Sequence, residues 1–201
     1  MKIRTLMVGN PITITERASI QQAIEIMKTN SIRHLPVVGR GSVLKGFVTL
    51  ADLKTGFIPS MVGDVSLKDL MIKNPVTVGP DDYIEVAAQR IYEHKIGGMP
   101  VVQDGKLVGV ITQTDILRAF IDMMGILTAT SRIDVVLGND PGAFKKSLQI
   151  INDSGGDIVN VGVKPQMTGD RTYYFRLSPC KTSPIKDALE KEGFQVVDAI
   201  D

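Results

Sequence analysis

The stretch NPITI at residues 10–14 returns 64 residues later as NPVTV, and the Leu-Met pair just before it returns with it. PVV at residues 36–38 is repeated at the same offset. GFVTLADL, which begins at Gly46, returns as GVITQTDI from Gly109, at an offset of 63. A shared offset in separate blocks indicates two copies of one structural unit. We therefore expect a pseudo-two-fold pair of units with paired sites.

Within each copy the hydrophobic spacing changes from two to about three and a half and back, which predicts alternating strands and helices. The expected order is strand, helix, strand, strand, helix, and Ser19 is the expected N-cap of the first helix. One copy is small for a stable core, so the two copies, at residues 1–63 and 64–130, should pack together. The inward helix faces are formed by Ile20, Ala23, Ile24 and Met27 in the first copy and by Ile84, Ala87, Ala88 and Ile91 in the second.

Residues 131–201 show no trace of the repeat. Their pattern predicts strand, helix, two strands, helix and strand, a βαββαβ order with two helices on one side of an antiparallel sheet. Before this module, the apolar stretch DILRAFIDMMGILTATS predicts a helix that reaches about Thr130 and either covers the pair or meets a partner. The predicted fold class is therefore α/β (α+β), with three modules.

Composition excludes several functional classes. The 201 residues are 43% hydrophobic and 22% charged, and the formal net charge is +1. No basic block indicates nucleic acid or an anionic membrane surface, and no apolar segment reaches the roughly 18 residues of a membrane span. Without a recognisable leader segment, we expect a cytoplasmic protein. Cys180 is a single cysteine, which excludes an internal disulfide and a cysteine metal cage.

The repeated block ends in a Thr followed three residues later by an Asp, as Thr49 with Asp52 and as Thr112 with Asp115. Both pairs stand where a strand leads into a helix. One interpretation is a capping box, which satisfies backbone amides and needs no ligand. The other interpretation is a binding site, because a carboxylate at this place can accept hydrogen bonds from both hydroxyls of a ribose.

The blocks together resemble a known family. Asn-Pro-x-Thr, a helix, Pro-Val-Val, a turn and Gly-x-x-Thr-x-x-Asp, all duplicated, resemble a tandem pair of CBS domains, also called a Bateman module, over residues 1 to about 120. Such pairs bind adenosine compounds in two clefts between the copies. The resemblance implies AMP, ADP, ATP or S-adenosylmethionine as ligand, and no catalytic cofactor.

In that family each cleft combines the Thr and Asp of one copy with the extended segment and pre-strand residues of the other. The resemblance therefore implies one cleft formed by Thr112, Asp115, Thr13, Ile14, Arg33, His34 and Pro36. It implies a second cleft formed by Thr49, Asp52, Thr77, Val78 and Pro100. Gly97-Gly98 stand where the first copy has Arg33-His34, so we expect unequal clefts, with the Asp115 cleft tighter for a charged nucleotide. For Arg33 and His34 a solvated strand edge is the alternative.

The third module resembles an ACT domain in its element order and in the turn formed by Asn139, Asp140, Pro141 and Gly142. This resemblance implies pairing of such domains and a small effector, often an amino acid, held against the turn. The alternative is that the turn only starts a helix. A CBS pair followed by an ACT domain resembles the acetoin-utilisation B-type proteins, which implies a regulatory role in carbon metabolism.

The sequence has few of the residue patterns that an enzyme active site requires. His34 and His94 lie in different blocks and do not form a metal-ligand spacing, and the chain has no phosphate-binding Gly-x-x-x-x-Gly-Lys loop. Cys180 has only Lys181 as a basic neighbour in sequence, which favours an inert thiol. We expect a non-catalytic sensor that forms at least a homodimer and acts on itself or on a partner protein. A structural adaptor with degenerate sites and a nucleotide-processing enzyme are the alternatives.

Overall fold

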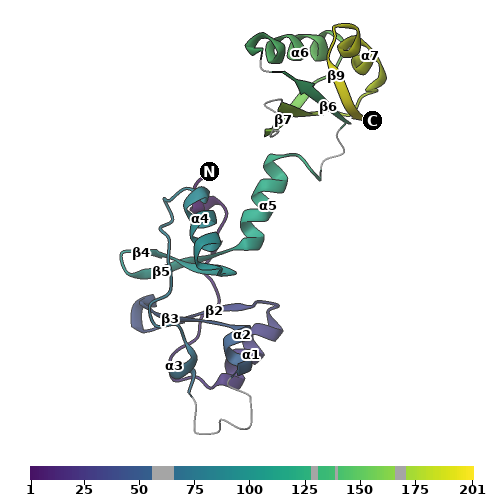
Figure 1. Cartoon of the computed structure of the whole chain (residues 1–201). Coiled ribbons are helices and arrows are strands. Elements are labelled where there is room, and N and C mark those ends of the chain that lie inside the picture. Colours follow the sequence, from purple (N-terminus) through teal and green to yellow (C-terminus); the bar gives the residue numbers. More distant parts are fainter. Residues whose placement is uncertain (56–65, 128–130, 139, 166–170) are drawn as a thin grey trace. The chain divides into compact units, whose positions relative to one another are not determined.

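The computed structural model describes residues 1–55, 66–127, 131–138, 140–165 and 171–201 (Figure 1). Contacts divide the chain into two compact units, Met1–Arg118 and Ala119–Asp201. The division falls inside one helix, α5, which spans Gln113–Met123.

The first unit contains both copies of the repeat, and each copy has the expected helix, two strands and final helix, whereas the expected first strand is only an isolated bridge, at Ile14 and at Val78. The first copy consists of η1 (Ile3–Thr5), β1 (Val8–Gly9), α1 (Ile20–Thr29), β2 (His34–Val38), η2 (Arg40–Ser42), β3 (Leu44–Thr49) and α2 (Leu50–Thr55). The second consists of α3 (Leu67–Leu70), α4 (Ile84–His94), β4 (Gly98–Gln103), β5 (Lys106–Thr112) and α5. Ser19 caps α1 as predicted, because its Oγ accepts a hydrogen bond from the backbone of Gln22 at 3.1 Å.

Each copy is built on an antiparallel hairpin, β2 with β3 and β4 with β5. The extended segment before each helix joins the hairpin by a parallel bridge, at Ile14 in one copy and Val78 in the other. The amide of Ile14 donates to the Pro36 carbonyl at 3.0 Å, and that of Val78 donates to Pro100 at 3.2 Å. The NPxTx and PVV blocks recur together because, in each copy, the extended NPxTx segment pairs with the strand that contains PVV.

The two copies exchange the segments that contain their Leu-Met pairs. Strand β1 pairs with β5 of the second copy, with Val8 opposite Val110. In the other direction, Ile72 and Phe47 exchange two backbone hydrogen bonds of 2.9 and 3.0 Å. Each copy therefore completes the sheet of the other, an exchange that the sequence pattern did not predict.

The same exchange explains the glycine that opens each GxxT block. A Cβ atom built on Gly46 would lie 2.6 Å from the Sδ atom of Met71, and one built on Gly109 would lie 2.6 Å from the Sδ atom of Met7. Neither glycine has a positive φ. Glycine is needed here for space, because the methionine of the opposite copy crosses directly over the strand.

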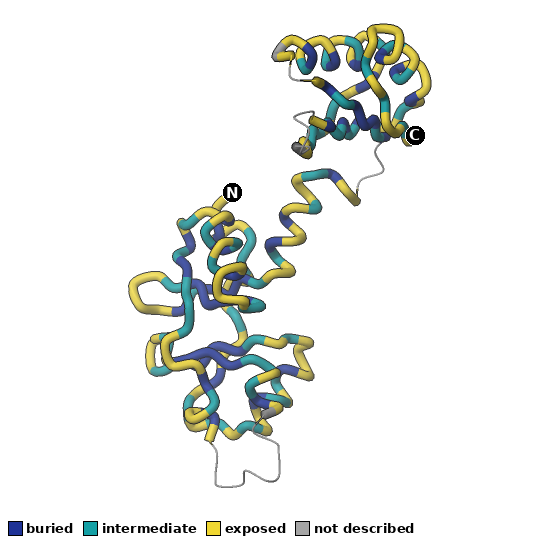
Figure 2. The backbone as a smooth tube through the Cα atoms, viewed as in Figure 1, coloured by how far each residue is buried: buried dark blue, intermediate teal, exposed yellow. Residues whose placement is uncertain are grey.

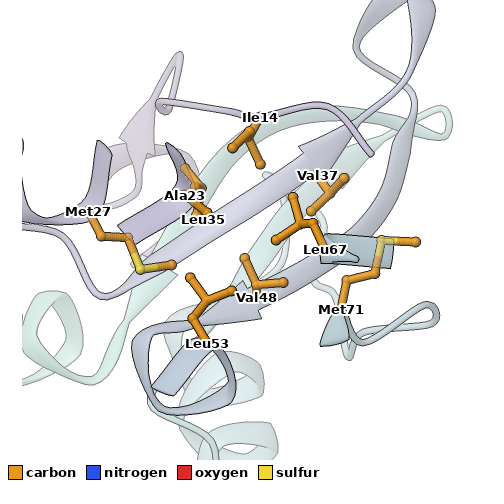
Figure 3. Close-up of a cluster of buried hydrophobic side chains, with 9 residues drawn as sticks. All are labelled: Ile14, Ala23, Met27, Leu35, Val37, Val48, Leu53, Leu67 and Met71. Carbon is orange, nitrogen blue, oxygen red and sulfur yellow. The ribbon is translucent and has the colours of Figure 1, made fainter. Parts of the chain in front are cut away.

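The core of the first copy confirms that the copies depend on each other. Figure 3 shows nine of its buried side chains, and they come from both repeats. Leu67 and Met71 belong to the second copy in sequence, yet they pack with Leu35, Val48 and Leu53 of the first. The burial colours in Figure 2 place the dark blue residues along the strands and on the inward sides of the helices.

The second unit contains the predicted βαββαβ arrangement. Its elements are β6 (Ser131–Leu137), α6 (Pro141–Asp153), β7 (Ile158–Pro165), β8 (Arg171–Leu177), α7 (Ser183–Lys191) and β9 (Gln195–Ile200). The strands are ordered β7-β8-β6-β9 and every neighbouring pair is antiparallel. Helices α6 and α7 lie on the same face of this sheet (Figure 1). Phe175 of β8 is fully buried in the core between sheet and helices.

The helix that was expected to reach about Thr130 is shorter. α5 ends at Met123, and Gly125 follows with a positive φ of 63°. A glycine in the left-handed region just after the last turn is a common helix stop. The apolar composition of the stretch concealed this signal, and residues 128–130 lie outside the described part of the chain. In the described ranges, none of the helices combines the length and hydropathy that a bilayer crossing requires.

Candidate functional site

The first unit contains a cavity of about 640 Å³ to which both copies contribute. This volume lies in the range typical of small-molecule pockets. Its lining includes residues of both repeats: Arg33, His34, Phe47, Thr49, Asp52, Lys54, Asn74, Val76, Lys95, Gly97, Gly98 and Gln113. A ligand in this cavity would therefore contact the strands and helix starts of both repeats.

The Thr-Asp pairs have the same geometry in both copies. One carboxylate oxygen of Asp52, Oδ2, accepts from the backbone amide of Thr49 at 2.9 Å and from its hydroxyl at 2.7 Å. In the second copy, Oδ2 of Asp115 accepts from the same two groups of Thr112 at 2.8 and 2.6 Å. Both pairs are thus capping arrangements. A carboxylate has about four acceptor positions, so capping through Oδ2 and ligand binding are compatible.

The two acids are placed differently relative to the cavity. Asp52 is half-buried and lines it, together with Thr49. Thr112 and Asp115 are not among the described residues along this cavity, although Gln113 between them is. The cavity is therefore the one that belongs to the Asp52 pair.

His34 also lines this cavity. It stands opposite Thr49 in the β2–β3 hairpin, and its ring stacks on Phe47 with centroids 5.8 Å apart. A Cβ atom built on Gly97 would lie 2.9 Å from the Nε2 atom of His34. The ring of the first copy thus occupies the space that a side chain at residue 97 of the second copy would need.

Burial lowers the pKa of His34 below its usual 6.5, and the neighbouring Arg33 guanidinium lowers it further. The carboxylates of Asp52 and Asp115 oppose this shift, because both favour the protonated ring. The carboxylates of both copies therefore act electrostatically on the His34 ring, which is itself partly buried.

The placement of Arg33 and His34 differs from the expectation that assigned them to the Asp115 cleft. Both residues line the cavity that holds Asp52. The physical reason is the hairpin register, which sets the first residue of β2 directly beside Thr49 of its own copy. Tighter binding of a charged nucleotide at the Asp115 cleft stays a prediction, since Asp115 also acts electrostatically on His34.

Three permanent cations line the cavity: Arg33, Lys54 and Lys95. Among the described residues, the ion pairs of the structure include none of these three. Asp52 is the acidic residue among those that line it. Lys54 and Lys95 were missed by sequence reasoning because isolated lysines carry no motif. Asn74 and Val76 could have been found, since they belong to the repeated NPVTV block.

Most of the other residues predicted for the two clefts form backbone hydrogen bonds within the copies. Ile14 and Val78 are buried, and the amide and carbonyl of each bond to the adjoining strand. Pro36 and Pro100 are buried and supply the carbonyls that accept these bonds. Thr13 is exposed and Thr77 is half-buried, and the Thr77 carbonyl accepts a hydrogen bond from the Arg90 guanidinium.

The turn predicted for an effector in the second unit forms the start of α6. Asp140 is the N-cap of this helix, and its Oδ1 accepts from the amide of Gly142 at 2.9 Å, with Pro141 in the first turn. Asn139 lies outside the described residues. Over the described ranges, the structure also contains no group of three or more His, Cys, Asp or Glu side chains that could hold a metal ion.

A family model described as CBS domain matches residues 3–57 and 67–122. A curated relative, homoserine O-acetyltransferase of Methanocorpusculum labreanum, is 36% identical over 114 residues, which are 56% of this chain and 23% of that protein. L-aspartate semialdehyde sulfurtransferase of Methanocaldococcus jannaschii is 29% identical over 119 residues, which are 59% of this chain and 23% of that protein. The chain thus spans about a quarter of the length of these relatives.

Among solved structures, the CBS domain pair of protein MJ0100 in complex with 5′-methylthioadenosine and S-adenosyl-L-methionine is 28% identical, with a TM-score of 0.56. The match covers 60% of this chain and 95% of that one. CBSX2 in complex with AMP is 27% identical, with a TM-score of 0.54 and coverages of 60% and 96%. A putative acetoin utilization protein (AcuB) from Vibrio cholerae is 29% identical, with a TM-score of 0.55 and coverages of 61% and 91%.

Proposed function

Because the chain belongs to the CBS-domain family, we propose that it is a non-catalytic regulatory sensor that binds an adenosine derivative in the cavity at Asp52. The observation that carries this proposal is the position of the Asp52 carboxylate along a cavity to which both copies contribute. Similar CBS pairs have been solved with S-adenosyl-L-methionine and 5′-methylthioadenosine, and with AMP, which supports the ligand class. Asp52 would accept hydrogen bonds from the ribose hydroxyls while Oδ2 remains in the capping box.

Regulation would follow from the exchange between the copies. A ligand that touches residues of both copies, such as His34 and Gly98, stabilises one relative packing of the two hairpins over others. Differential affinity for two packings is the physical requirement for a regulatory signal. The enzyme names of two relatives do not extend to this chain, because the match covers 23% of their length.

We also propose that the second unit is an ACT domain, with an amino acid as a candidate effector at the start of α6, and that the chain forms at least a homodimer. Its βαββαβ order supports this assignment. The proposal includes a role in carbon metabolism of the acetoin-utilisation type with a partner protein as target, and it is supported by the similarity to the Vibrio cholerae protein over the CBS pair.

The test is thermal unfolding of the whole protein with AMP, ADP, ATP, S-adenosylmethionine, 5′-methylthioadenosine and, as a control, inorganic phosphate. A ligand at a hundred times its Kd stabilises the folded state by about 2.7 kcal/mol, so the midpoint must rise with at least one adenosine compound. No shift with any of them would favour the structural adaptor. Conversion of a nucleotide into product, followed by chromatography, would favour the enzyme.

Binding of a phosphorylated nucleotide should depend on pH through His34. A bound phosphate favours the charged ring, so affinity rises as the pH falls toward the pKa of His34, which lies below 6.5 in the free protein. We expect a gain of about three- to tenfold between pH 7.5 and 5.5, measured by titration calorimetry. His34→Gln is the matched control, because it removes this gain and leaves only the titration of the nucleotide's own phosphate. An unchanged pH profile in that variant would contradict the prediction.

A further inference from the structure

The cations along the Asp52 cavity are not duplicated with the fold. Lys54 is the second residue after Asp52, and at the offset of 63 the second copy has Leu117. Lys95 corresponds to Ser31 at the offset of 64, and both residues have a positive φ of 53°, which confirms that they are structural equivalents. The cleft related by the pseudo-two-fold therefore has an apolar and a small polar side chain where this cavity has two lysines.

The third cation is also unmatched. Arg33 lines this cavity, and its equivalent in the second copy is Gly97. A Cβ atom at residue 97 would lie 2.9 Å from Nε2 of His34, so a side chain there would require the His34 ring to move. Arg33 therefore has no basic counterpart in the second copy.

The charge of the cavity lining indicates which class of ligand it favours. Arg33, Lys54 and Lys95 are exposed residues of the cavity lining and are absent from the ion pairs found among the described residues, so three cations and the Asp52 carboxylate line the same cavity. The carboxylate of Asp52 is bonded to Thr49 at the helix start. Such a concave positive surface attracts anions and repels the sulfonium and ammonium groups of S-adenosylmethionine.

We infer that the Asp52 cavity is a polyphosphate-nucleotide site that takes one ADP or ATP per chain, with Lys54 and Lys95 as phosphate-binding residues. This inference rests on the proposed function and specifies it. The adenosine half lies against Asp52 and the residues around Val76, and the phosphate chain extends toward the three cations. The Asp115 side, with Leu117 and Ser31, does not form a second site for a polyphosphate.

The experiment is titration calorimetry of the full chain with adenosine, AMP, ATP and S-adenosylmethionine at low and physiological salt. We expect affinity to rise from adenosine to AMP to ATP, a stoichiometry of one ATP per chain, and weaker ATP binding at high salt. Lys54→Ala and Lys95→Ala should each weaken ATP about tenfold and leave adenosine unchanged. Lys28→Ala, an exposed lysine of α1, is the matched control and should leave ATP binding unchanged.

The outcomes separate the two levels of the proposal. S-adenosylmethionine that binds as tightly as ATP, two equal ATP sites per chain, or equal losses in all three lysine variants would overturn this inference and leave the adenosine-binding function intact. No binding of any adenosine compound would overturn the proposed function itself. Asp52→Asn should abolish ATP binding while Asp115→Asn retains it, and the reverse result would assign the site to the other acid.

Discussion

Replacing Gly97 by valine is expected to weaken nucleotide binding about a hundredfold, which corresponds to about 2.7 kcal/mol. A Cβ atom at this position would lie 2.9 Å from Nε2 and 3.2 Å from Cε1 of His34, so the ring must leave its place on Phe47. The two methyl groups of valine would then occupy part of the cavity that Gly97 lines. Gly97 has no positive φ, so the backbone itself accepts a side chain.

Titration calorimetry with ATP measures this effect, and the unfolding midpoint shows whether the variant is folded. Gly9→Val is the matched control, because a Cβ at Gly9 meets nothing within 4 Å and its φ is not positive. We expect that variant to bind ATP as the parent chain does. Parent-like affinity in Gly97→Val would show that the nucleotide does not occupy this cavity.

Replacing Phe175 by alanine is expected to lower the free energy of unfolding by about 3–5 kcal/mol. The side chain is fully buried in the core of the second unit, and its ring stacks near Tyr173 and Phe144 with centroids 6.2 and 6.3 Å apart. Alanine would leave a cavity between the sheet and the helices. Because a domain is stable by only about 5–15 kcal/mol, a loss of this size removes a large part of its stability.

Denaturant unfolding followed by circular dichroism measures the change. Tyr92→Ala is the control, since this ring is 85% exposed on α4 and its removal should change stability by no more than about 0.5 kcal/mol. A Phe175→Ala chain that unfolds within 1 kcal/mol of the parent would mean that the core of the second unit is not packed around this ring.

Much of the fold could be predicted from local patterns in the sequence. The cap at Ser19, the hairpins and the βαββαβ order depend on neighbouring residues, and the structure confirms them. The Thr-Asp pairs also behave as the capping interpretation predicted, because they involve residues three apart. The expected helix to Thr130 was wrong because its apolar composition outweighed the single glycine, Gly125, that ends it.

The sequence by itself determined that two like units exist and which residues begin and end their strands and helices, since these depend on short-range periodicity and capping. Only the tertiary structure decided which copy each segment completes, so that Met71 packs on Gly46 and Met7 on Gly109. It alone also decided that His34, Lys54 and Lys95 share one cavity with Asp52. A repeat offset shows that two segments are alike, but it does not show which of two equivalent neighbours each segment will contact. That choice depends on packing between residues far apart in the chain.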